Sequence, residues 1–245
     1  MASPFGIVTE RQRVAITASV APKYAVAGVP AGFFQEHFVL RETATADARL
    51  LCCGLHQHHT ILVLVADFTG VPLPVDDLTD LTHKQLQREP NGHPVDLFRG
   101  LYQSIDAALG TPSAARRGNL MLLKVSTSIR RVTFATTNLP FLMVRNQRVK
   151  RITTKLAVRS RLSKSEVYQC RFKPGDVMYL YTDGLIEQVG GPAHQPLGQH
   201  NFEALLANNH GSHAAEQRRY LLETRKSWAG EDAPLKDVLA VGLRF

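Results

Sequence analysis

The residues best suited to chemistry stand at the end of an apolar run, in the segment Thr182-Asp183-Gly184. A Lys-Pro-Gly-Asp turn at residues 173–176 precedes this run, and the apolar pattern at 177–182 predicts a buried strand. A strand end holds the Asp183 carboxylate in place, and the glycine after it leaves room for water or an ion. These features predict an aspartate that binds a hard divalent cation, although an ordinary Asp-Gly turn has the same sequence.

Many short strands and a few helices must position this aspartate. Helical spacing of apolar residues is found at 76–88 and 95–109, at 201–208, and from Ser212, the expected cap, to 228. Strand patterns are found at residues 14–20, 49–55, 60–66, 120–125, 132–136, 142–145, 148–152, 168–172, 177–182 and 238–245. Regular alternation of strands and helices is missing, so the sequence predicts an α+β sandwich in a single domain covering residues 1–245.

The composition is that of a packed globular chain with a basic surface. Of the 245 residues, 44% are hydrophobic and 20% are charged, which argues against a disordered or fibrous protein. The longest apolar run, residues 61–66, is too short to span a bilayer, and the first 20 residues lack the core of a signal peptide. We therefore expect a soluble, cytoplasmic protein without a membrane partner, and its net charge of +8 favours an acidic or phosphorylated partner.

The segment from Lys173 to Glu187 resembles the "PGD…LLLYTDGVTEA" motif of the metal-dependent PPM protein phosphatases, in their SpoIIE-like branch. Residues 62–70, LVLVADFTG, are similar to the family's "LVIADVTGHG", and three pieces between residues 119 and 145 follow its "LTFAGANNPLYLVR" hairpins. The C-terminal KDVLAVGLR, residues 236–244, stands where the family has "DDITLLGLR". The shared order of these pieces implies a PPM-type β-sandwich flanked by helices.

The resemblance also implies a chemistry. In that family, aspartates at one end of the sandwich hold two Mg²⁺ or Mn²⁺ ions, which generate a hydroxide nucleophile and neutralise phosphoryl oxygens. The substrates are phosphoserine or phosphothreonine proteins, and in the SpoIIE-like branch they are often small anti-anti-sigma-type regulators. Asp67 and Asp183 match two of the family's metal-binding aspartates, which makes them the candidate catalytic and metal-binding residues of this chain.

The rest of the metal-binding pattern departs from the family. A gap-free alignment places Arg49 at the first metal aspartate and Lys236 at the last, and no His-Gly pair follows Gly70. At ~4 Å and an effective dielectric constant near 20, one unit-charge pair is worth roughly 4 kcal/mol. A cation in place of a carboxylate therefore opposes a divalent ion. We predict a degenerate site in which Arg49 and Lys236 pair with Asp67 and Asp183.

A shifted alignment would restore some carboxylates. If the first hairpin is two residues longer, Asp47 becomes a metal ligand, and Asp237 or Asp232 could serve at the last position. In the gap-free alignment Cys52 replaces a further family aspartate, and it stands beside Cys53. Neighbouring strand residues point to opposite faces, so these cysteines are expected in different layers rather than in a redox motif.

Three functions follow from these alternatives. The favoured prediction is a non-catalytic regulatory pseudophosphatase that binds a protein partner and needs no cofactor. The first alternative is an active Mg- or Mn-dependent protein-serine/threonine phosphatase that acts on a phosphorylated regulator, such as an anti-anti-sigma-type protein. The second alternative is a basic nucleic-acid-binding module.

A basic stretch between residues 145 and 164 bears on the partner. It contains eight cations and no acidic residue, namely Arg145, Arg148, Lys150, Arg151, Lys155, Arg159, Arg161 and Lys164. A charge run is usually a solvated face, but an acidic or phosphorylated protein would offset the mutual repulsion of these cations. No aromatic residue interleaves with them, which disfavours stacking on single-stranded nucleic acid.

Three histidines, His56, His58 and His59, fall in a turn between the strand patterns at 49–55 and 60–66. No cysteine or carboxylate stands at ligand spacing to complete a zinc site. We therefore interpret the histidines as part of a polar turn.

Replacing Arg148, Arg151 and Arg159 with Glu should leave the melting temperature nearly unchanged, because exposed charges contribute little to stability. The same change should weaken capture of an acidic partner, mainly through slower association at low salt. Pull-down with both proteins from the source cell's lysate, compared by mass spectrometry, measures this. Equal recovery of the same proteins would identify the stretch as a solvated face, and recovery of nucleic acid that nuclease removes would favour the nucleic-acid-binding module.

Overall fold

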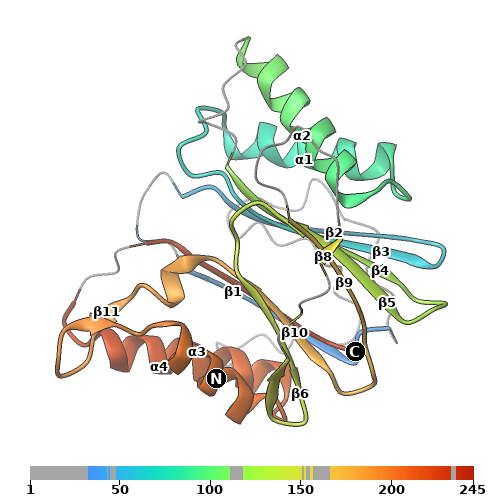
Figure 1. Cartoon of the computed structure of the whole chain (residues 1–245). Helices are drawn as coiled ribbons and strands as arrows, with labels where there is room; N and C mark the ends of the chain where they lie inside the picture. Colours follow the sequence, from blue (N-terminus) through green and yellow to red (C-terminus); the bar gives the residue numbers. More distant parts are fainter. Residues whose placement is uncertain are drawn as a thin grey trace, which may run out of the picture.

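The computed structural model describes residues 33–42, 44, 48–110, 118–150, 152, 155–156, 166–232 and 236–245. Two β-sheets pack face to face, and a pair of helices covers the outer face of each sheet (Figure 1). This is the α+β sandwich that the sequence predicts. The strand expected at residues 14–20 lies outside the described residues. No helix in the described ranges is long and apolar enough to cross a membrane.

The larger sheet contains six strands and carries the predicted histidine turn. They are β2 (Leu50–Gln57), β3 (Thr60–Asp67), β4 (Asn119–Ser126), β5 (Arg131–Thr136), β8 (Lys155–Leu156) and β9 (Glu166–Arg171). Their order across the sheet is β2-β3-β4-β5-β9-β8, and neighbours run antiparallel. The β2–β3 hairpin is confirmed, and it turns at His58, which has a φ of 51°.

The smaller sheet contains five strands. They are β1 (Glu36–Glu42), β6 (Phe141–Arg145), β7 (Arg148–Lys150), β10 (Val177–Tyr181) and β13 (Val238–Arg244), in the order β1-β13-β10-β6-β7. The strand patterns at 142–145 and 148–152 correspond to β6 and β7, which pair as a hairpin with positive φ at both Asn146 and Gln147, as a two-residue hairpin turn requires. Strands β9 and β10 belong to different sheets, so the turn at 173–176 crosses the sandwich. The sequence did not predict β1 or the short ribbon of β11 (Val189–Gly190) and β12 (Gln195–Pro196).

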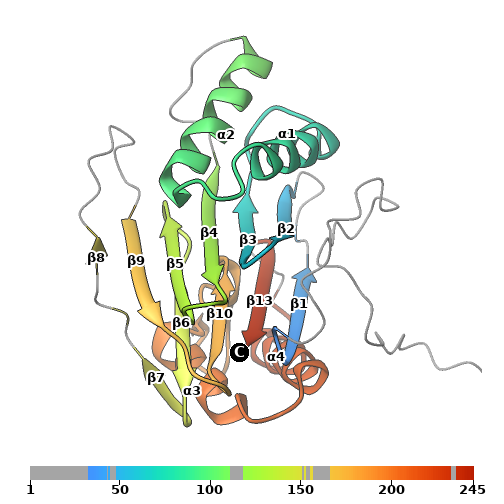
Figure 2. The same cartoon turned by 90° about the vertical axis from the view of Figure 1, so that its right-hand side faces the viewer.

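The four helices occur where the sequence predicts them. They are α1 (Val75–Arg88), α2 (Pro94–Leu109), α3 (Gln199–Asn209) and α4 (Ala214–Ala229). Helices α1 and α2 cover the six-stranded sheet, and α3 and α4 cover the five-stranded sheet (Figure 2). The prediction that Ser212 caps α4 is wrong. The N-cap is His213, whose backbone N–H donates to Glu216 Oε2 at 3.3 Å, and the Ser212 hydroxyl instead donates to Asn209 Oδ1 at 2.8 Å.

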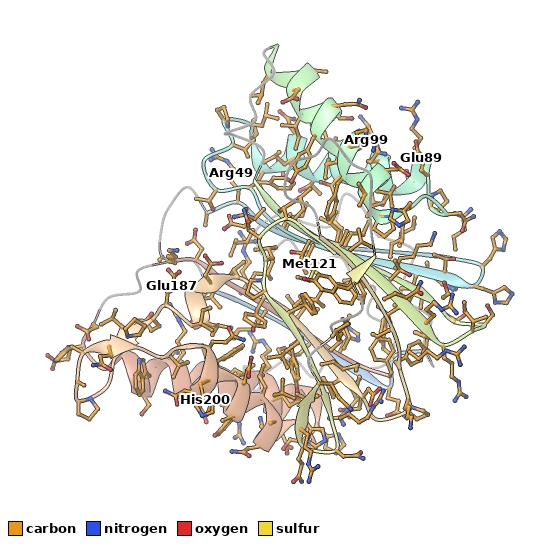
Figure 3. All side chains as sticks on the ribbon, viewed as in Figure 1. Arg49, Glu89, Arg99, Met121, Glu187 and His200 are labelled. Carbon is orange, nitrogen blue, oxygen red and sulfur yellow. The ribbon has the colours of Figure 1, made fainter. Side chains whose placement is uncertain are left out.

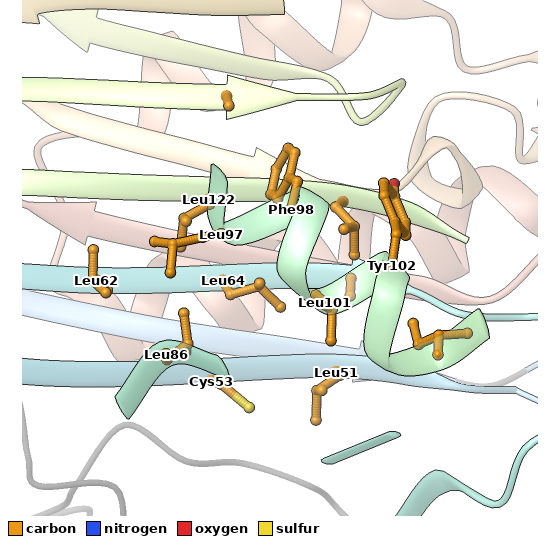
Figure 4. Close-up of a cluster of buried hydrophobic side chains, with 14 of the residues drawn as sticks. Leu51, Cys53, Leu62, Leu64, Leu86, Leu97, Phe98, Leu101, Tyr102 and Leu122 are labelled. Atoms are coloured by element: carbon orange, nitrogen blue, oxygen red, sulfur yellow. The ribbon is translucent and has the colours of Figure 1, made fainter. Parts of the chain in front are cut away.

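Apolar side chains fill three layers. In β3, Leu62 and Leu64 pack under α1 and α2, whereas Ile61, Val63 and Val65 pack between the sheets. Figure 4 shows the first of these clusters, with leucines of β2, β3 and β4 facing α2. Each fully buried Leu, Ile or Val side chain contributes roughly 1.5–3 kcal/mol, so these layers dominate the stability.

A buried ion pair fastens the turn at 173–176 to the five-stranded sheet. The Asp176 side chain is only 2% exposed, and its oxygens accept from Arg145 Nε at 2.7 Å and Nη2 at 2.6 Å. Asp176 Oδ2 also accepts from the Lys173 backbone N–H at 2.7 Å. Hydrogen bonding to Asp176 raises the pKa of Arg145. The first cation of the predicted basic stretch therefore has a counter-charge that lies far along the sequence.

Helix α4 is attached to β1, the edge strand of the smaller sheet. Glu36 accepts from the Ala214 backbone N–H at 3.0 Å and contacts His213 Nδ1 at 2.5 Å. Arg218 Nε donates to the Val39 carbonyl at 3.0 Å, and Arg225 pairs with Glu42. Side chains of the helix therefore bind the strand at its start, middle and end.

Removing the charge of Asp176 tests the turn. Asp176→Asn should lower the free energy of unfolding by about 3 kcal/mol, because it leaves a partly buried guanidinium without its carboxylate. Urea denaturation measures the loss. The matched control is Asp96→Asn, which breaks the exposed pair with Arg99 and should cost less than about 0.5 kcal/mol. Equal urea midpoints for the two variants would contradict a structural role for the buried pair.

Helix α4 should also give the protein a pH-dependent stability. The hydrogen bond to Glu36, followed by the charges of Glu36 and Glu216, raises the pKa of His213 above 6.5, while Arg244 acts in the opposite direction. A raised folded-state pKa adds stability below the unfolded-state pKa, and this stability is lost as pH rises through the folded-state value. Wild type should therefore lose stability relative to His213→Gln as the pH rises from about 6.

Urea midpoints of both proteins across this pH range provide the measurement. Burial lowers the pKa of His37, which has the opposite effect on stability, but His37 is present in both proteins and cancels in their difference. A difference between the two proteins that does not change with pH would contradict the prediction.

Candidate functional site

Asp67 lies at the end of β3, where the strand leaves the sheet. Its Oδ1 accepts from the Thr69 backbone N–H at 2.9 Å, so the side chain also shapes the turn that follows. The backbone of Arg49 borders the same turn, because the Phe68 N–H donates to the Arg49 carbonyl at 2.9 Å. Gly70 closes the turn with a φ of 87°, which a residue with a side chain rarely adopts.

Thr182 and Gly184 explain the form of the Thr-Asp-Gly motif. The Thr182 hydroxyl donates to the Asp237 carbonyl at 3.2 Å and accepts from the Leu239 N–H at 3.0 Å. A Cβ on Gly184 would lie 2.3 Å from the Asp237 carbonyl oxygen, so only glycine fits. Both residues join the end of β10 to the start of β13. This connection brings Asp183 next to residues 236–237.

Lys236 occupies the space between two carboxylates. Its Nζ lies 3.4 Å from Asp183 Oδ2 and 2.6 Å from Glu187 Oε2. The hydrogen bond to Glu187, together with the charges of both carboxylates, raises the pKa of Lys236, and partial burial opposes this. The ammonium is thus held in its charged form, and it pairs with Asp183 as the sequence predicts.

The sequence reasoning missed Glu187. Its backbone N–H donates to the Asp183 carbonyl at 2.9 Å across the short 3-10 helix Asp183–Leu185, which places the two carboxylates on one side. The motif segment included Glu187 without giving it a role. The available signal was its spacing, because residues four apart in a helical turn are neighbours.

Arg49 stands on the same edge of the sandwich as Glu187 (Figure 3). Its backbone N–H lies 3.5 Å from the Thr69 hydroxyl. In the described part of the chain no carboxylate lies within ion-pair distance of the Arg49 guanidinium, so the predicted pair with Asp67 is absent there. The guanidinium therefore adds positive charge to this edge.

The other carboxylates considered from the sequence have different surroundings. Asp237 is buried, and its Oδ1 accepts from the Ala44 N–H at 2.7 Å. Asp232 contacts His194 Nδ1 at 3.1 Å. Asp47 lies outside the described residues. Among the residues that the structure describes, no three His, Cys, Asp or Glu side chains converge as metal ligands would.

The basic stretch is divided between two environments and a part that is not described. Arg145 is engaged by Asp176, whereas Arg148 and Lys150 are exposed on the β6–β7 hairpin. Lys155 lies in β8, of which only the backbone is described. The remaining cations, Arg151, Arg159, Arg161 and Lys164, lie outside the described residues.

The adjacent cysteines are core residues, and the three histidines lie at or next to the β2–β3 turn. Cys52 packs between the sheets and Cys53 packs under the helices, which confirms that they face opposite layers. Burial raises the pKa of the Cys52 thiol to about 12, so it stays protonated at neutral pH. His56 Nε2 lies 2.8 Å from the His58 carbonyl within the β2–β3 turn.

Comparison with known proteins identifies the family. Residues 58–245 match the sequence profile of the family described as Stage II sporulation protein E (SpoIIE). Because this match covers more than half of its length, the chain belongs to the SpoIIE family. No match was found among curated proteins.

Solved structures share the fold. The SiaA-PP2C domain of Pseudomonas aeruginosa has a TM-score of 0.74 and 20% sequence identity, with 88% of each chain covered. The phosphatase domain of the cell fate determinant SpoIIE from Bacillus subtilis has a TM-score of 0.59 and 15% identity, covering 85% of this chain and 90% of that one. RsbX, solved in complex with magnesium, has a TM-score of 0.55 and 12% identity, covering 85% and 94%. The fold is therefore of the PP2C phosphatase type.

Proposed function

We propose that this SpoIIE-family protein is a regulatory pseudophosphatase, which keeps the phosphatase fold and binds a protein partner without hydrolysing phosphate. The observation that supports this most is the Lys236 ammonium, 2.6 Å from Glu187 and 3.4 Å from Asp183. A hard divalent cation needs several oxygen ligands and no competing positive charge. Here the Lys236 ammonium neutralises the Asp183 carboxylate in place of a metal ion.

Arg49 adds to this argument. Arg49 directly precedes β2, and its backbone carbonyl accepts from the Phe68 N–H, so its backbone borders the turn after Asp67. A guanidinium stays charged at all ordinary pH values. Lys236 thus pairs with one of the two aspartates that resemble metal ligands, and the Arg49 guanidinium adds positive charge to the same edge of the sandwich. The donor set within the described residues does not fit a pair of Mg²⁺ or Mn²⁺ ions, and we derive no hydrolytic step from it.

The alternative is an active Mg- or Mn-dependent protein-serine/threonine phosphatase acting on a phosphorylated regulator. One observation favours it: Asp67 ends strand β3 and Asp183 follows strand β10 by two residues, so the two sheets present both aspartates at strand ends, as the resemblance to PPM phosphatases requires. Asp47 would add a third carboxylate in a shifted alignment. For either function, a phosphorylated or acidic regulatory protein fits a basic chain of this family. No structural observation favours the nucleic-acid-binding module.

Metal binding separates the two functions. Wild type should bind Mn²⁺ with a dissociation constant above about 1 mM, comparable with the weakest all-oxygen sites. Lys236→Gln should bind Mn²⁺ more tightly, because it frees Asp183 and Glu187 and removes the opposing charge. Calorimetry with wild type, Lys236→Gln and the control Lys226→Gln measures both effects. Two micromolar Mn²⁺ sites in wild type would contradict the pseudophosphatase.

Catalysis gives a second test. Hydrolysis of p-nitrophenyl phosphate by wild type with Mn²⁺ should not exceed background, because the described residues supply too few ligands to generate a metal-bound hydroxide. Asp183→Asn should leave that background unchanged. The double reversion Arg49→Asp with Lys236→Asp should restore some metal binding, but the turn after Gly70 still departs from the family. Mn²⁺-dependent turnover by wild type that Asp183→Asn abolishes would establish the active phosphatase instead.

A further inference from the structure

Positive charge is concentrated in the middle of the sequence. Between Asp106 and Glu166 there is no acidic residue, and this interval contains 13 of the 29 Lys and Arg residues of the chain. The interval supplies strands β4 to β8, which lie in both sheets. Strands β4 to β8 therefore carry cations but no acidic residue that could neutralise them.

The cations gather at the ends of strands β5 and β9. Arg131, the first residue of β5, is directly opposite Arg171, the last residue of β9, in their antiparallel pairing. Arg130 precedes Arg131, and its carbonyl accepts from the Phe172 N–H at 3.3 Å. Lys173 follows two residues after Arg171 and is exposed. Like charges directly opposite each other destabilise an antiparallel pair, so this arrangement opposes folding.

The described structure offers these four cations no counter-charge. Asp176 is the acidic residue nearest to Lys173 in sequence, but it is buried and already engaged by Arg145 and the Lys173 backbone. None of the side chains of Arg130, Arg131, Arg171 and Lys173 makes an ion pair with a described residue. Ile129, in the turn before Arg130, is 52% exposed, although large apolar side chains are usually covered.

We propose that Arg130, Arg131, Arg171 and Lys173 form a docking surface, the Arg131–Arg171 surface, for an acidic segment of a partner protein. The guanidinium groups of two arginines in register present forks that match carboxylates in bidentate geometry. Ile129 provides an apolar contact beside them. A Glu- or Asp-rich segment would supply the missing counter-charge and remove the repulsion between β5 and β9.

Other occupants fit this surface less well. The exposed large hydrophobic residues of the described chain are Ile129 and Tyr220, and Tyr220 lies on α4, so no exposed aromatic ring is present here for base stacking. A single isoleucine does not anchor a protein in a bilayer. A second copy of this chain carries the same net charge of +8 and is repelled. Charge complementarity therefore favours an acidic polypeptide.

The Arg131–Arg171 surface lies at the end of the strands that is remote from Asp67 and Asp183. Arg131 pairs with Ser126, the last residue of β4. Asn119, the first residue of β4, pairs with Asp67, so Arg131 and Asp67 lie at opposite ends of β4. Figure 1 shows the β4–β5 turn on the right of the sandwich, and Figure 3 shows Arg49 and Glu187 on the left. Docking here goes beyond the proposed function, because it does not depend on whether the opposite edge binds metal or hydrolyses phosphate.

Fluorescence anisotropy with a labelled Glu-rich peptide tests the proposal on the full chain at low salt. Arg131→Gln with Arg171→Gln should weaken binding by about tenfold or more, because the peptide loses its charge-assisted hydrogen bonds to both guanidinium groups. Added salt should weaken wild-type binding in the same direction. The control, Arg99→Gln with Arg219→Gln, removes two exposed cations on α2 and α4 and should bind like wild type.

A urea midpoint for the Arg131/Arg171 variant that equals or exceeds that of wild type would show that lost binding is not caused by unfolding. Equal peptide binding by wild type and this variant would overturn the proposal. So would a DNA duplex or a phosphatidylserine vesicle that binds wild type more tightly than the peptide and loses binding in the same variant. Self-association of wild type that the variant abolishes would also overturn it, by assigning the surface to a second copy.

Discussion

Burial of both faces of strands β3 and β4 is the constraint on which the rest of the structure depends. From Ile61 to Ala66 each residue is at most 2% exposed, so neither face of the strand can meet water. One face needs the helices α1 and α2, and the other needs a second sheet, whose own outer face then needs α3 and α4. The layered sandwich follows, and it places the ends of β3 and β10 on one edge.

At that edge the connection between β10 and β13 does not depend on the charged side chains beside it. Thr182 and Gly184 connect β10 to β13 through hydrogen bonds and close contact, and these interactions need no metal. The frame that presents Asp183 can therefore persist after its charge has been neutralised by Lys236. A family motif can survive in sequence because it joins two strands, even where the ionic chemistry around it has changed.

Much of the fold could be predicted because it depends on local patterns. Residues 60–66 are a continuous apolar run, and residues 95–109 repeat with helical period, so these elements were found. Strand β1 was missed because only Phe38 and Leu40 are fully buried and charged residues flank the short apolar centre of the strand. What determines its position is its pairing with β13, nearly 200 residues later in the chain.

The candidate site was only partly predictable for the same reason. Asp67, Asp183 and Lys236 were found by resemblance and alignment, and the Lys236–Asp183 pair is present. The sequence could not reveal the ion pair of Arg145 with Asp176, or that of Lys236 with Glu187, because both contacts depend on tertiary structure. The opposition of Arg131 and Arg171 likewise depends on strand register, which the sequence alone did not specify.

The attachment of α4 to β1 has a consequence for behaviour in a crowded cell. A strand at the edge of a sheet exposes unpaired backbone groups that can recruit a strand from another molecule. Here Arg218 occupies the Val39 carbonyl, and Arg225 and Glu42 place charges beside the end of the strand. A foreign strand would have to displace these side chains before it could pair. Helix α4 thus protects this edge of the sandwich against strand-to-strand aggregation.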